Sequence, residues 1–330
     1  MTETRNAVLV TGGAGYIGSH GCKRLAQAGF LPVTYDNLSR GHRHFVKWGP
    51  LEEGDIGDAA ALDRAIERHR PVAIMHFAAL TYVGESVAEP AMYYRTNVSG
   101  SLALLDAARR HGIRSFVFSS TCATYGPPER LPIAEDTPQQ PIHPYGSSKL
   151  MIERMLADFG SAYGLRWSAL RYFNASGADP DGEIGESHDP ETHLIPLVLM
   201  AAAGERPHID ILGDQYPTHD GTCIRDYIHV SDLAEAHLLA LRYLLAGGAS
   251  RAFNLGTGVG HTVREVVRAA ERVTGRPVPV RLAPARPGDS PSLVADPSLA
   301  EAVLGFRARF GLEESIETAW RWYVGNSGTR

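Results

Sequence analysis

The sequence predicts an α/β protein built on a doubly wound parallel sheet. Short β-branched segments alternate with stretches of helical periodicity through the first half of the chain. These short segments are apolar on both faces, as strands buried between two layers of helices are. A glycine-rich turn follows the first of them. Beyond about residue 175 this rhythm gives way to loops rich in Gly, Pro and Asp, which indicates a second part of different design.

The expected elements follow one another along the chain. Strands are expected at residues 7–11, 32–36, 72–77, 115–119 and 167–171. Helices are expected from the glycine turn to about residue 28 and at residues 58–68, 97–110 and 145–163. Residues 1–175 would form the sheet domain. Residues 176–330 would form a smaller mixed α/β lobe at its carboxyl edge, where open α/β sheets bind ligands, with segments near 226–256 returning to the first domain.

Composition and charge exclude several classes of function. The net charge of −5 over 330 residues leaves no basic surface for nucleic acid. We find no apolar core of a signal peptide and no run long enough to cross a membrane. Three cysteines without CxxC spacing favour neither a disulfide framework nor a zinc site. No HExxH or similar histidine pair occurs on a helix, so no metal is expected. We expect a cytoplasmic protein.

The turn after the first strand is a dinucleotide-binding motif of the Rossmann type. Gly12, Gly15 and Gly18 lie between a strand and a helix, in the sequence GGAGYIG. Glycine allows a tight turn, a close approach of the backbone to a pyrophosphate, and close packing of helix and strand. The N-terminus of the helix then offers free N–H groups to the phosphates.

The second strand ends in a carboxylate that selects the cofactor. Asp36 would accept hydrogen bonds from the hydroxyls of the adenine ribose and would repel a 2′-phosphate, which favours NAD over NADP. Arg40 complicates this choice because it is close enough in sequence to bind such a phosphate. Asp55 and Ile56 follow another strand, and we expect them to contact the adenine.

Tyr145 and Lys149 are spaced i, i+4 at the start of a predicted helix, so they share one helical face. A lysine cation one turn away, together with a cationic nicotinamide ring, would lower the pKa of the tyrosine hydroxyl. Such a tyrosine can take a proton from a sugar hydroxyl while hydride leaves the same carbon. The hydroxyl run Ser119-Ser120-Thr121 at the end of the preceding strand supports this interpretation.

Together these motifs resemble the extended short-chain dehydrogenase/reductases, and along nearly the whole chain the UDP-glucose 4-epimerases among them. The similar segments are GGAGYIGSH, YDNLSRG, VGES, YGSSKLMIE, RYFNASGA, YPTHDGTCIRDYIHVSDLA and FNLGTGVGHTV. The resemblance implies that NAD stays bound and that hydride passes from C4 of a UDP-sugar and back to its opposite face. Tyr145 would act as the base, Lys149 would hold the nicotinamide ribose, and Thr121 would contact the C4 oxygen.

The resemblance also implies the ligand contacts. The residues expected at the cofactor are Gly12, Gly15, Tyr16, Ile17, Gly18, Asp36, Asn37, Asp55, Ile56, Phe77, Ala78, Ala79, Asn97, Ser119, Tyr145, Lys149 and Tyr172. Those expected at the UDP-sugar are Thr121, Tyr145, Asn174, His193, Leu194, Arg225, Arg286, Asp289 and Leu293. A homodimer through helices near 86–111 and 145–163 is also implied.

Two departures bear on the reaction and on the substrate. Related dehydratases carry an Asp-Glu pair directly after the threonine, and this chain has Cys122 and Ala123 there, so elimination of water lacks an acid and a base. Leu293 stands where the family often has a bulky aromatic residue, which suggests tolerance of UDP-N-acetylglucosamine. A UDP-pentose such as UDP-xylose, a net dehydratase or reductase, and a non-catalytic NAD-binding protein stay open as alternatives.

Overall fold

The computed structural model describes residues 6–286 and 288–326. Its centre is a parallel sheet of seven strands in the order β10-β6-β5-β4-β1-β2-β3. The strands are β1 (Ala7–Thr11), β2 (Leu31–Asp36), β3 (Leu51–Glu53), β4 (Ala73–His76), β5 (Ser115–Thr121), β6 (Arg166–Tyr172) and β10 (Arg251–Leu255). The order reverses between β1 and β4, which is the switch point where such sheets bind nucleotides. The predicted fold class is confirmed.

Alternate residues of each strand pack into two separate cores. In β1, Val8 and Val10 face a core shared with helices α1 (Tyr16–Gln27) and α8 (Val230–Leu245). Leu9 faces the opposite core, shared with helices that complete the other layer: α2 (Ala59–His69), α5 (Gly100–Arg110) and α6 (Pro144–Tyr163). Every residue of β1 and β5 is buried, as the apolar sequence of both faces predicts.

The structure corrects the boundaries of several elements. The strand expected before Asp55 is the edge strand β3, which has only three residues, none of them buried. Strand β5 continues to Thr121, so the hydroxyl run lies within the strand and not beyond it. The helix expected at residues 97–110 begins as a π-helical turn, η2 (Tyr94–Ser99), before α5, and the short helices α3 (Val83–Ala88) and α4 (Pro90–Tyr93) precede it.

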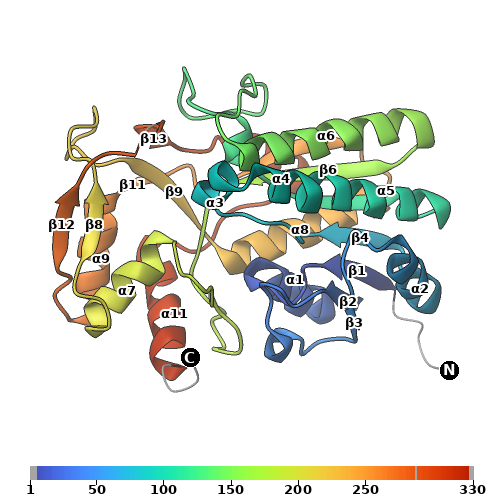
Figure 1. Cartoon of the computed structure of the whole chain (residues 1–330), viewed down its shortest axis with the longest axis horizontal. Coiled ribbons are helices and arrows are strands. Elements are labelled where there is room, and N and C mark those ends of the chain that lie inside the picture. Colours follow the sequence, from blue (N-terminus) through green and yellow to red (C-terminus); the bar gives the residue numbers. More distant parts are fainter. Residues whose placement is uncertain (1–5, 287, 327–330) are drawn as a thin grey trace.

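The second lobe is built from shorter elements, at the left of Figure 1. Strands β7 (Asn174–Ser176), β11 (Gly260–Thr262) and β13 (Ser292–Leu293) pair with β9 (Ile224–His229), and β8 (Ile209–Leu212) pairs with β12 (Val280–Ala283). Helices α7 (Leu194–Ala203), α9 (Val263–Thr274) and α11 (Leu312–Gly325) share one core. A short helix, α10 (Ser298–Leu304), packs near α8 and β10.

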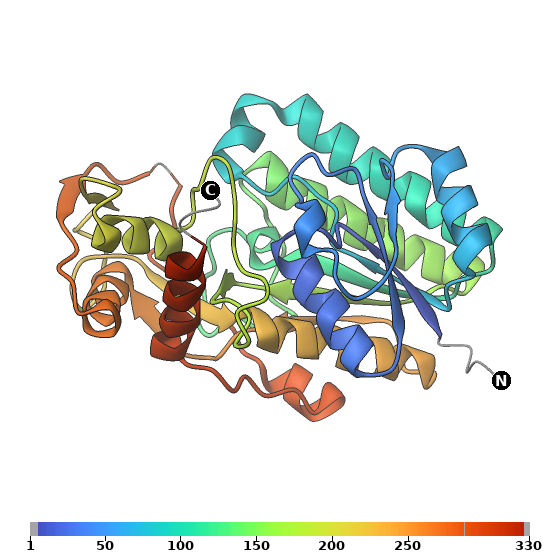
Figure 2. The same ribbon diagram turned by 90° about the horizontal axis from the view of Figure 1, so that it is seen from below.

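The chain returns to the large sheet between the strands of the second lobe. After β9, helix α8 packs against α1, and β10 then pairs with β6. Figure 2 shows α8 running along the larger lobe although it lies between segments of the smaller one in sequence. Among the helices that the structure describes, none has the length and apolar character to cross a membrane. The three cysteines are unpaired.

Four buried histidines predict that acid destabilises the protein. Burial lowers the pKa of His20 and His237 to about 4 and that of His76 and His229 to about 3. These side chains stay neutral in the folded protein but bind protons in the unfolded chain below about pH 6.5. The free energy of unfolding should therefore fall as the pH drops from 6.5 towards 4, by up to about 1.4 kcal/mol per pH unit for each histidine. Urea denaturation at pH 7 and pH 5 measures this change, and His237→Gln should make the dependence less steep.

Candidate active site

The glycine turn after β1 is shaped by close backbone contacts. Gly12 has φ of +73°, and a Cβ atom there would lie 2.5 Å from the backbone nitrogen of Ala78. A Cβ atom at Gly18 would lie 2.1 Å from the carbonyl oxygen of Gly12. Gly15 caps α1 without a side-chain hydrogen bond, and the first turn has no acidic residue. Only glycine allows these close backbone contacts, and no side chain competes for the helix N-terminus, so the turn fits a dinucleotide-binding motif.

Asp36 lies at the carboxyl end of β2 beside this turn. Its carboxylate accepts hydrogen bonds from the backbone N–H groups of Ala14 (3.0 Å) and Leu38 (2.8 Å). Burial raises its pKa, and the two backbone hydrogen bonds oppose that rise. Arg40 turns elsewhere: its guanidinium pairs with Glu85 at 2.8 Å and lies over the ring of Tyr82. Arg40, which could have bound a 2′-phosphate, is thus paired with Glu85, and this agrees with a preference for NAD over NADP.

The remaining residues expected at the cofactor line the ends of neighbouring strands. The Asn37 amide donates to the carboxylate of Asp55 at 2.8 Å, which joins the loops after β2 and β3, and Ile56 follows as a buried residue. Phe77, Ala78 and Ala79 directly follow β4. Tyr16 and Ile17 open α1. All of these positions lie at the carboxyl edge of the sheet.

Asn97 is fully buried and ties the loop after β4 to α6. Its side-chain oxygen accepts from the Leu80 N–H (2.8 Å), and its amide donates to the Leu80 carbonyl (3.0 Å) and to the Ser148 hydroxyl (3.0 Å). Three of the four hydrogen bonds that an amide side chain can make are thus used by the protein itself. Asn97 therefore positions the loop that carries residues 77–79.

The structure brings Tyr145, Lys149 and Thr121 together between α6 and the end of β5. Lys149 is buried, and its ammonium donates to the Ser119 carbonyl at 2.8 Å. Burial lowers the pKa of Lys149 to about 7, while the charge of Glu153 opposes this. The Thr121 hydroxyl accepts from the N–H of Ala123 at 3.2 Å, and it is close enough to Tyr145 to lower the pKa of that hydroxyl.

The predicted lowering of the Tyr145 pKa does not come from the chain's own groups. Burial raises the pKa of this hydroxyl well above its ordinary value, and the hydrogen bond from Thr121 only partly offsets the rise. Lys149 is not among the groups that shift it. Desolvation thus outweighs the effect expected from the i, i+4 spacing. The pKa of Tyr145 would be lowered only if a further positive charge were bound beside its hydroxyl.

The three consecutive hydroxyls have three separate partners because successive strand residues point to opposite faces. Ser119 hydrogen-bonds the hydroxyl of Tyr172 on the same face as Thr121. Burial raises the pKa of Tyr172 to about 12. Ser120 faces the other way and donates to the carboxylate of Glu153.

A buried ion pair lies under the catalytic strand end, and sequence reasoning missed it. Glu153 accepts from the Arg171 guanidinium at 2.6 Å, and both side chains are about nine-tenths buried. Arg171 also donates to the Tyr125 hydroxyl at 2.7 Å, which in turn donates to Asn254. An arginine within the apolar strand at 166–172 was the signal for this network.

The residues expected at the UDP-sugar converge on β9 and the loop before β13. Arg225 donates to the Asp289 carboxylate (3.0 Å) and to the Ser290 carbonyl (2.9 Å). Arg286 is exposed, and its carbonyl accepts from the N–H of Asp289. Asn174 begins β7, which pairs with β9. Arg286 and Asp289 thus share one loop, and Arg225 on β9 is tied to it.

Leu293 is next to Arg225 in the register of β13 and β9, and it packs with Cys122 and Phe173. This contact places Leu293 beside the residue that follows Thr121. The side chain at position 293 can therefore influence the space near Thr121.

His193 and Leu194 stand at the N-terminus of α7. The His193 Nδ1 lies 2.9 Å from the Glu186 carboxylate and 3.1 Å from that of Glu191, so this ring is paired within its own loop. His188 joins the same group. Of these four residues only His193 was predicted, as a contact of the UDP-sugar. The cluster was not expected because metal-binding histidines were expected as pairs on helices, whereas the spacing E-x-H-x-x-E-x-H lies in a loop.

Comparisons with known proteins agree with this geometry. Residues 8–256 match the NAD dependent epimerase/dehydratase family. Over 317 residues the chain is 55% identical to a UDP-glucose 4-epimerase of Rhizobium leguminosarum bv. trifolii, covering 96% of this chain and 97% of that one. A UDP-glucose 4-epimerase of Rhizobium meliloti is also 55% identical, over 96% of this chain and 97% of its own.

Solved structures show the same likeness. The UDP-glucose 4-epimerase of Brucella ovis, in complex with NAD, is 57% identical with a TM-score of 0.94, covering 96% of this chain and 98% of that one. That of Stenotrophomonas maltophila, with NAD and formylated UDP-arabinopyranose, is 41% identical with a TM-score of 0.95, covering 99% and 100%. This chain therefore belongs to the NAD dependent epimerase/dehydratase family, and its relatives within that family are UDP-glucose 4-epimerases.

Proposed function

We propose that this protein interconverts UDP-glucose and UDP-galactose by epimerisation at C4, with NAD retained as cofactor. The observation that carries the proposal is the presence of Tyr145, Thr121 and Lys149 at the carboxyl edge of the sheet, the edge that also carries the glycine cradle. The relatives at 55% identity are UDP-glucose 4-epimerases, which favours this sugar over a UDP-pentose or an N-acetylated sugar.

The chain's own residues supply the acid–base part of the reaction. Tyr145 removes the proton of the C4 hydroxyl and later returns it to the C4 oxygen. Thr121, which lies near Tyr145, would hold that oxygen, and Lys149 would hold the nicotinamide ribose. NAD, when bound, accepts the hydrogen of C4 as hydride and gives it back. Return of the hydride to the opposite face of the 4-keto sugar, after that sugar has rotated, would invert the configuration at C4. The sugar would be oxidised and then reduced, so atoms and electrons balance with no net redox change.

The neighbours of Thr121 argue against elimination of water. Burial raises the pKa of the Cys122 thiol to about 12, so this group stays neutral near pH 7. Ala123 carries no titratable group. The positions that follow the catalytic threonine therefore offer neither an acid nor a base, and oxidation with return at C4 is the chemistry that fits.

One experiment separates this function from its rivals. Purified protein would be assayed without added NAD on UDP-glucose and on UDP-xylose, and the NAD released on denaturation would be measured. We expect about one NAD per chain and turnover of UDP-glucose. Faster turnover of UDP-xylose would move the proposal to a pentose epimerase. A need for stoichiometric nicotinamide would contradict epimerisation and favour a reductase.

The proposal assigns the diphosphate and uridine to the second lobe. Arg225 and Arg286 would contact the diphosphate, because two guanidiniums suit its charge and geometry. Asp289, oriented by Arg225, would accept from the uridine ribose. The remaining contacts would come from Asn174, His193 and Leu194, and Leu293 would line the sugar pocket.

Arg286→Ala is expected to raise the KM for UDP-glucose about 10- to 100-fold with little change in kcat. The reason is that charge-assisted hydrogen bonds to the substrate are lost far from the reacting carbon. The matched control is Arg281→Ala, another exposed arginine of the same lobe, which pairs with Asp210 and should leave KM unchanged. An effect on kcat alone would rule out the assigned role of Arg286.

We also propose a cytoplasmic homodimer. The three unpaired cysteines suit a reducing compartment. Large apolar side chains are exposed on α3, α5 and α6, among them Val87, Leu102 and Met151. Such a patch marks an interface between subunits. Sedimentation of the wild type against Leu102→Glu tests it: the wild type should sediment as a dimer and the variant as a monomer, and a monomeric wild type would refute it.

A further inference from the structure

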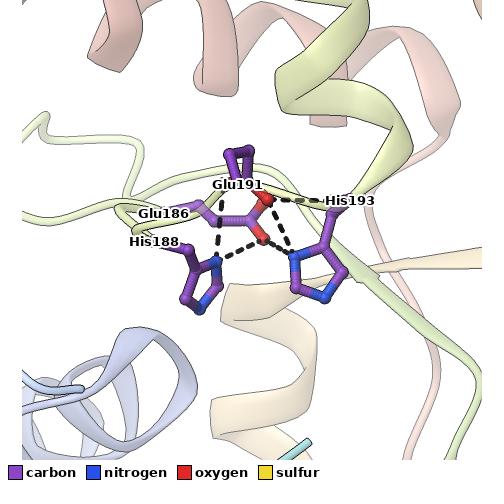
Figure 3. Close-up of side chains that lie close together, drawn as sticks. All are labelled: Glu186, His188, Glu191 and His193. Carbon is purple, nitrogen blue, oxygen red and sulfur yellow. Dashed lines mark hydrogen bonds and ion pairs between the residues drawn. The ribbon is translucent and has the colours of Figure 1, made fainter. Parts of the chain in front are cut away.

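Four side chains with metal-ligating atoms converge in the loop between β7 and α7. They are Glu186, His188, Glu191 and His193, here called the His/Glu cluster. Their ligand atoms all lie within 4.8 Å of one another. Figure 3 shows both imidazole rings directed at the two carboxylates.

The distances within the cluster match those between ligands of one small cation. The Nδ1 atom of His193 lies 2.9 Å from Glu186 and 3.1 Å from Glu191. The Nδ1 atom of His188 lies 3.3 Å from Glu186 and 3.5 Å from Glu191. Tetrahedral zinc with bonds of about 2.0–2.1 Å separates its ligands by about 3.4 Å. A small contraction or expansion of the cluster would thus accommodate the ion.

The two carboxylates of the cluster lack a fixed positive charge. Glu186 is 9% exposed and Glu191 is 11% exposed, and neither pairs with a lysine or an arginine among the residues that the structure describes. By contrast, the nearby carboxylates of Asp179, Asp181 and Glu183 surround the ammonium of Lys23 at 2.6–2.8 Å. Buried carboxylates need a compensating charge. In the His/Glu cluster this charge comes either from the protonated imidazoles of His188 and His193 or from a divalent cation that takes the place of their two protons.

We propose that Glu186, His188, Glu191 and His193 bind one zinc ion. Two imidazole nitrogens and two carboxylate oxygens form a set that suits zinc better than magnesium or calcium, which prefer oxygen ligands alone. Four protein ligands leave no open position, so the ion would be structural and not catalytic. The sequence, which has no metal-binding motif on a helix, predicted the opposite, namely that the protein binds no metal.

The neighbouring contacts show how such an ion would be held. The Oε1 atom of Glu191 accepts from the N–H groups of Thr192 (2.7 Å) and His193 (2.8 Å), and these bonds orient the carboxylate with Oε1 3.1 Å from Nδ1 of His193 and Oε2 3.5 Å from Nδ1 of His188. The ring of His188 packs edge-on against Tyr16 and Tyr82, which fixes its plane. Ligands oriented in this way by surrounding groups bind metal more tightly.

A bound zinc ion would cross-link the two ends of the loop. Glu186 and His193 are the two ends of the eight-residue segment, and His193 caps α7. The segment is also tied to the sheet domain, where Tyr82 donates to the Pro190 carbonyl at 3.1 Å and His42 bonds the Ser187 carbonyl at 2.9 Å. Zinc would thus fix the start of α7, where the proposed function places the uridine. The metal site itself does not depend on that function.

Direct metal analysis tests the site. Purified full-length protein with its NAD would be equilibrated with zinc, dialysed against zinc-free buffer, and analysed by mass spectrometry for metal. We expect about one zinc per chain. Glu186→Gln and His188→Ala should each weaken zinc binding more than about 100-fold, since even loss of a supporting residue costs 10- to 100-fold. The matched control is His219→Ala, an exposed histidine paired with Glu265 at 3.1 Å, which should keep the zinc.

A second measurement does not depend on the folding of variants. Wild-type protein titrated with Co²⁺ should develop the intense visible absorption of tetrahedral cobalt, saturating at about one ion per chain, and zinc should abolish it. Two results would overturn the proposal: wild-type protein that retains no zinc and shows no such band, or zinc bound equally well by folded Glu186→Gln. The cluster would then be an ion-paired group of histidines and glutamates alone.

Discussion

Tyr145→Phe is expected to lower kcat for UDP-glucose by about 10³-fold while NAD stays bound. The substitution removes only the hydroxyl that takes the proton from the C4 oxygen, and positioned proton transfer commonly accounts for a 10²- to 10⁴-fold rate enhancement. The glycine cradle and Asp36 lie on other elements, so cofactor binding should be preserved. Steady-state kinetics measure kcat, and NAD released on denaturation measures occupancy.

A matched control lies on the same helix. Tyr163 ends α6 and is 53% exposed, so Tyr163→Phe removes the same atom far from Thr121 and should leave kcat unchanged. If Tyr145→Phe kept near-native turnover, the tyrosine would not be the base. If it lost NAD, its role would be binding of the cofactor.

Glu153→Ala is expected to lower the free energy of unfolding by about 3–5 kcal/mol. The variant leaves the Arg171 guanidinium buried without its carboxylate partner, and an unpaired buried charge is costly. Ser120 would lose its acceptor as well. Urea denaturation followed by circular dichroism measures the change.

The double variant Glu153→Leu/Arg171→Met separates the ion pair from the loss of packing. Removal of both charges with apolar groups of similar size should cost much less than Glu153→Ala alone, since the desolvation penalty disappears. The exposed pair of Arg272 and Glu313 is the second control, and its removal should have little effect. A Glu153→Ala variant as stable as the wild type would show that Arg171 finds compensation elsewhere.

Local patterns account for the part of the fold that could be predicted from the sequence. Strand β1, the glycines at 12, 15 and 18, and Asp36 lie within 30 residues, and each has a steric or electrostatic role that its neighbours reveal. The spacing of Tyr145 and Lys149 is likewise local. The predicted family is confirmed.

Features that depend on distant partners could not be predicted. Arg40 looked free to bind a phosphate, but Glu85, 45 residues away, holds it. The pKa of Tyr145 follows the desolvation of its hydroxyl among Thr121, Cys122 and Tyr172, whereas the helix spacing suggested the opposite direction. The domain division and the individual ligand contacts stay predictions that mutants must test.

The His/Glu cluster shows a different limit. Its four residues lie within eight positions, so the information was local, but a loop has no periodicity that tells which side chains meet. Only the fold of residues 186–193 brings His188 and His193 onto the same pair of carboxylates. Spacing on a helix can be interpreted from sequence, and spacing in a loop cannot.

The most direct test of the central claim is proton NMR of the purified protein incubated with UDP-glucose alone in D₂O. Epimerisation by retained NAD predicts that UDP-galactose accumulates to equilibrium with protium still at C4, because hydride returned from a bound cofactor does not exchange with solvent. Deuterium at C4, a 4-keto product that accumulates, or no conversion of UDP-glucose would contradict the account.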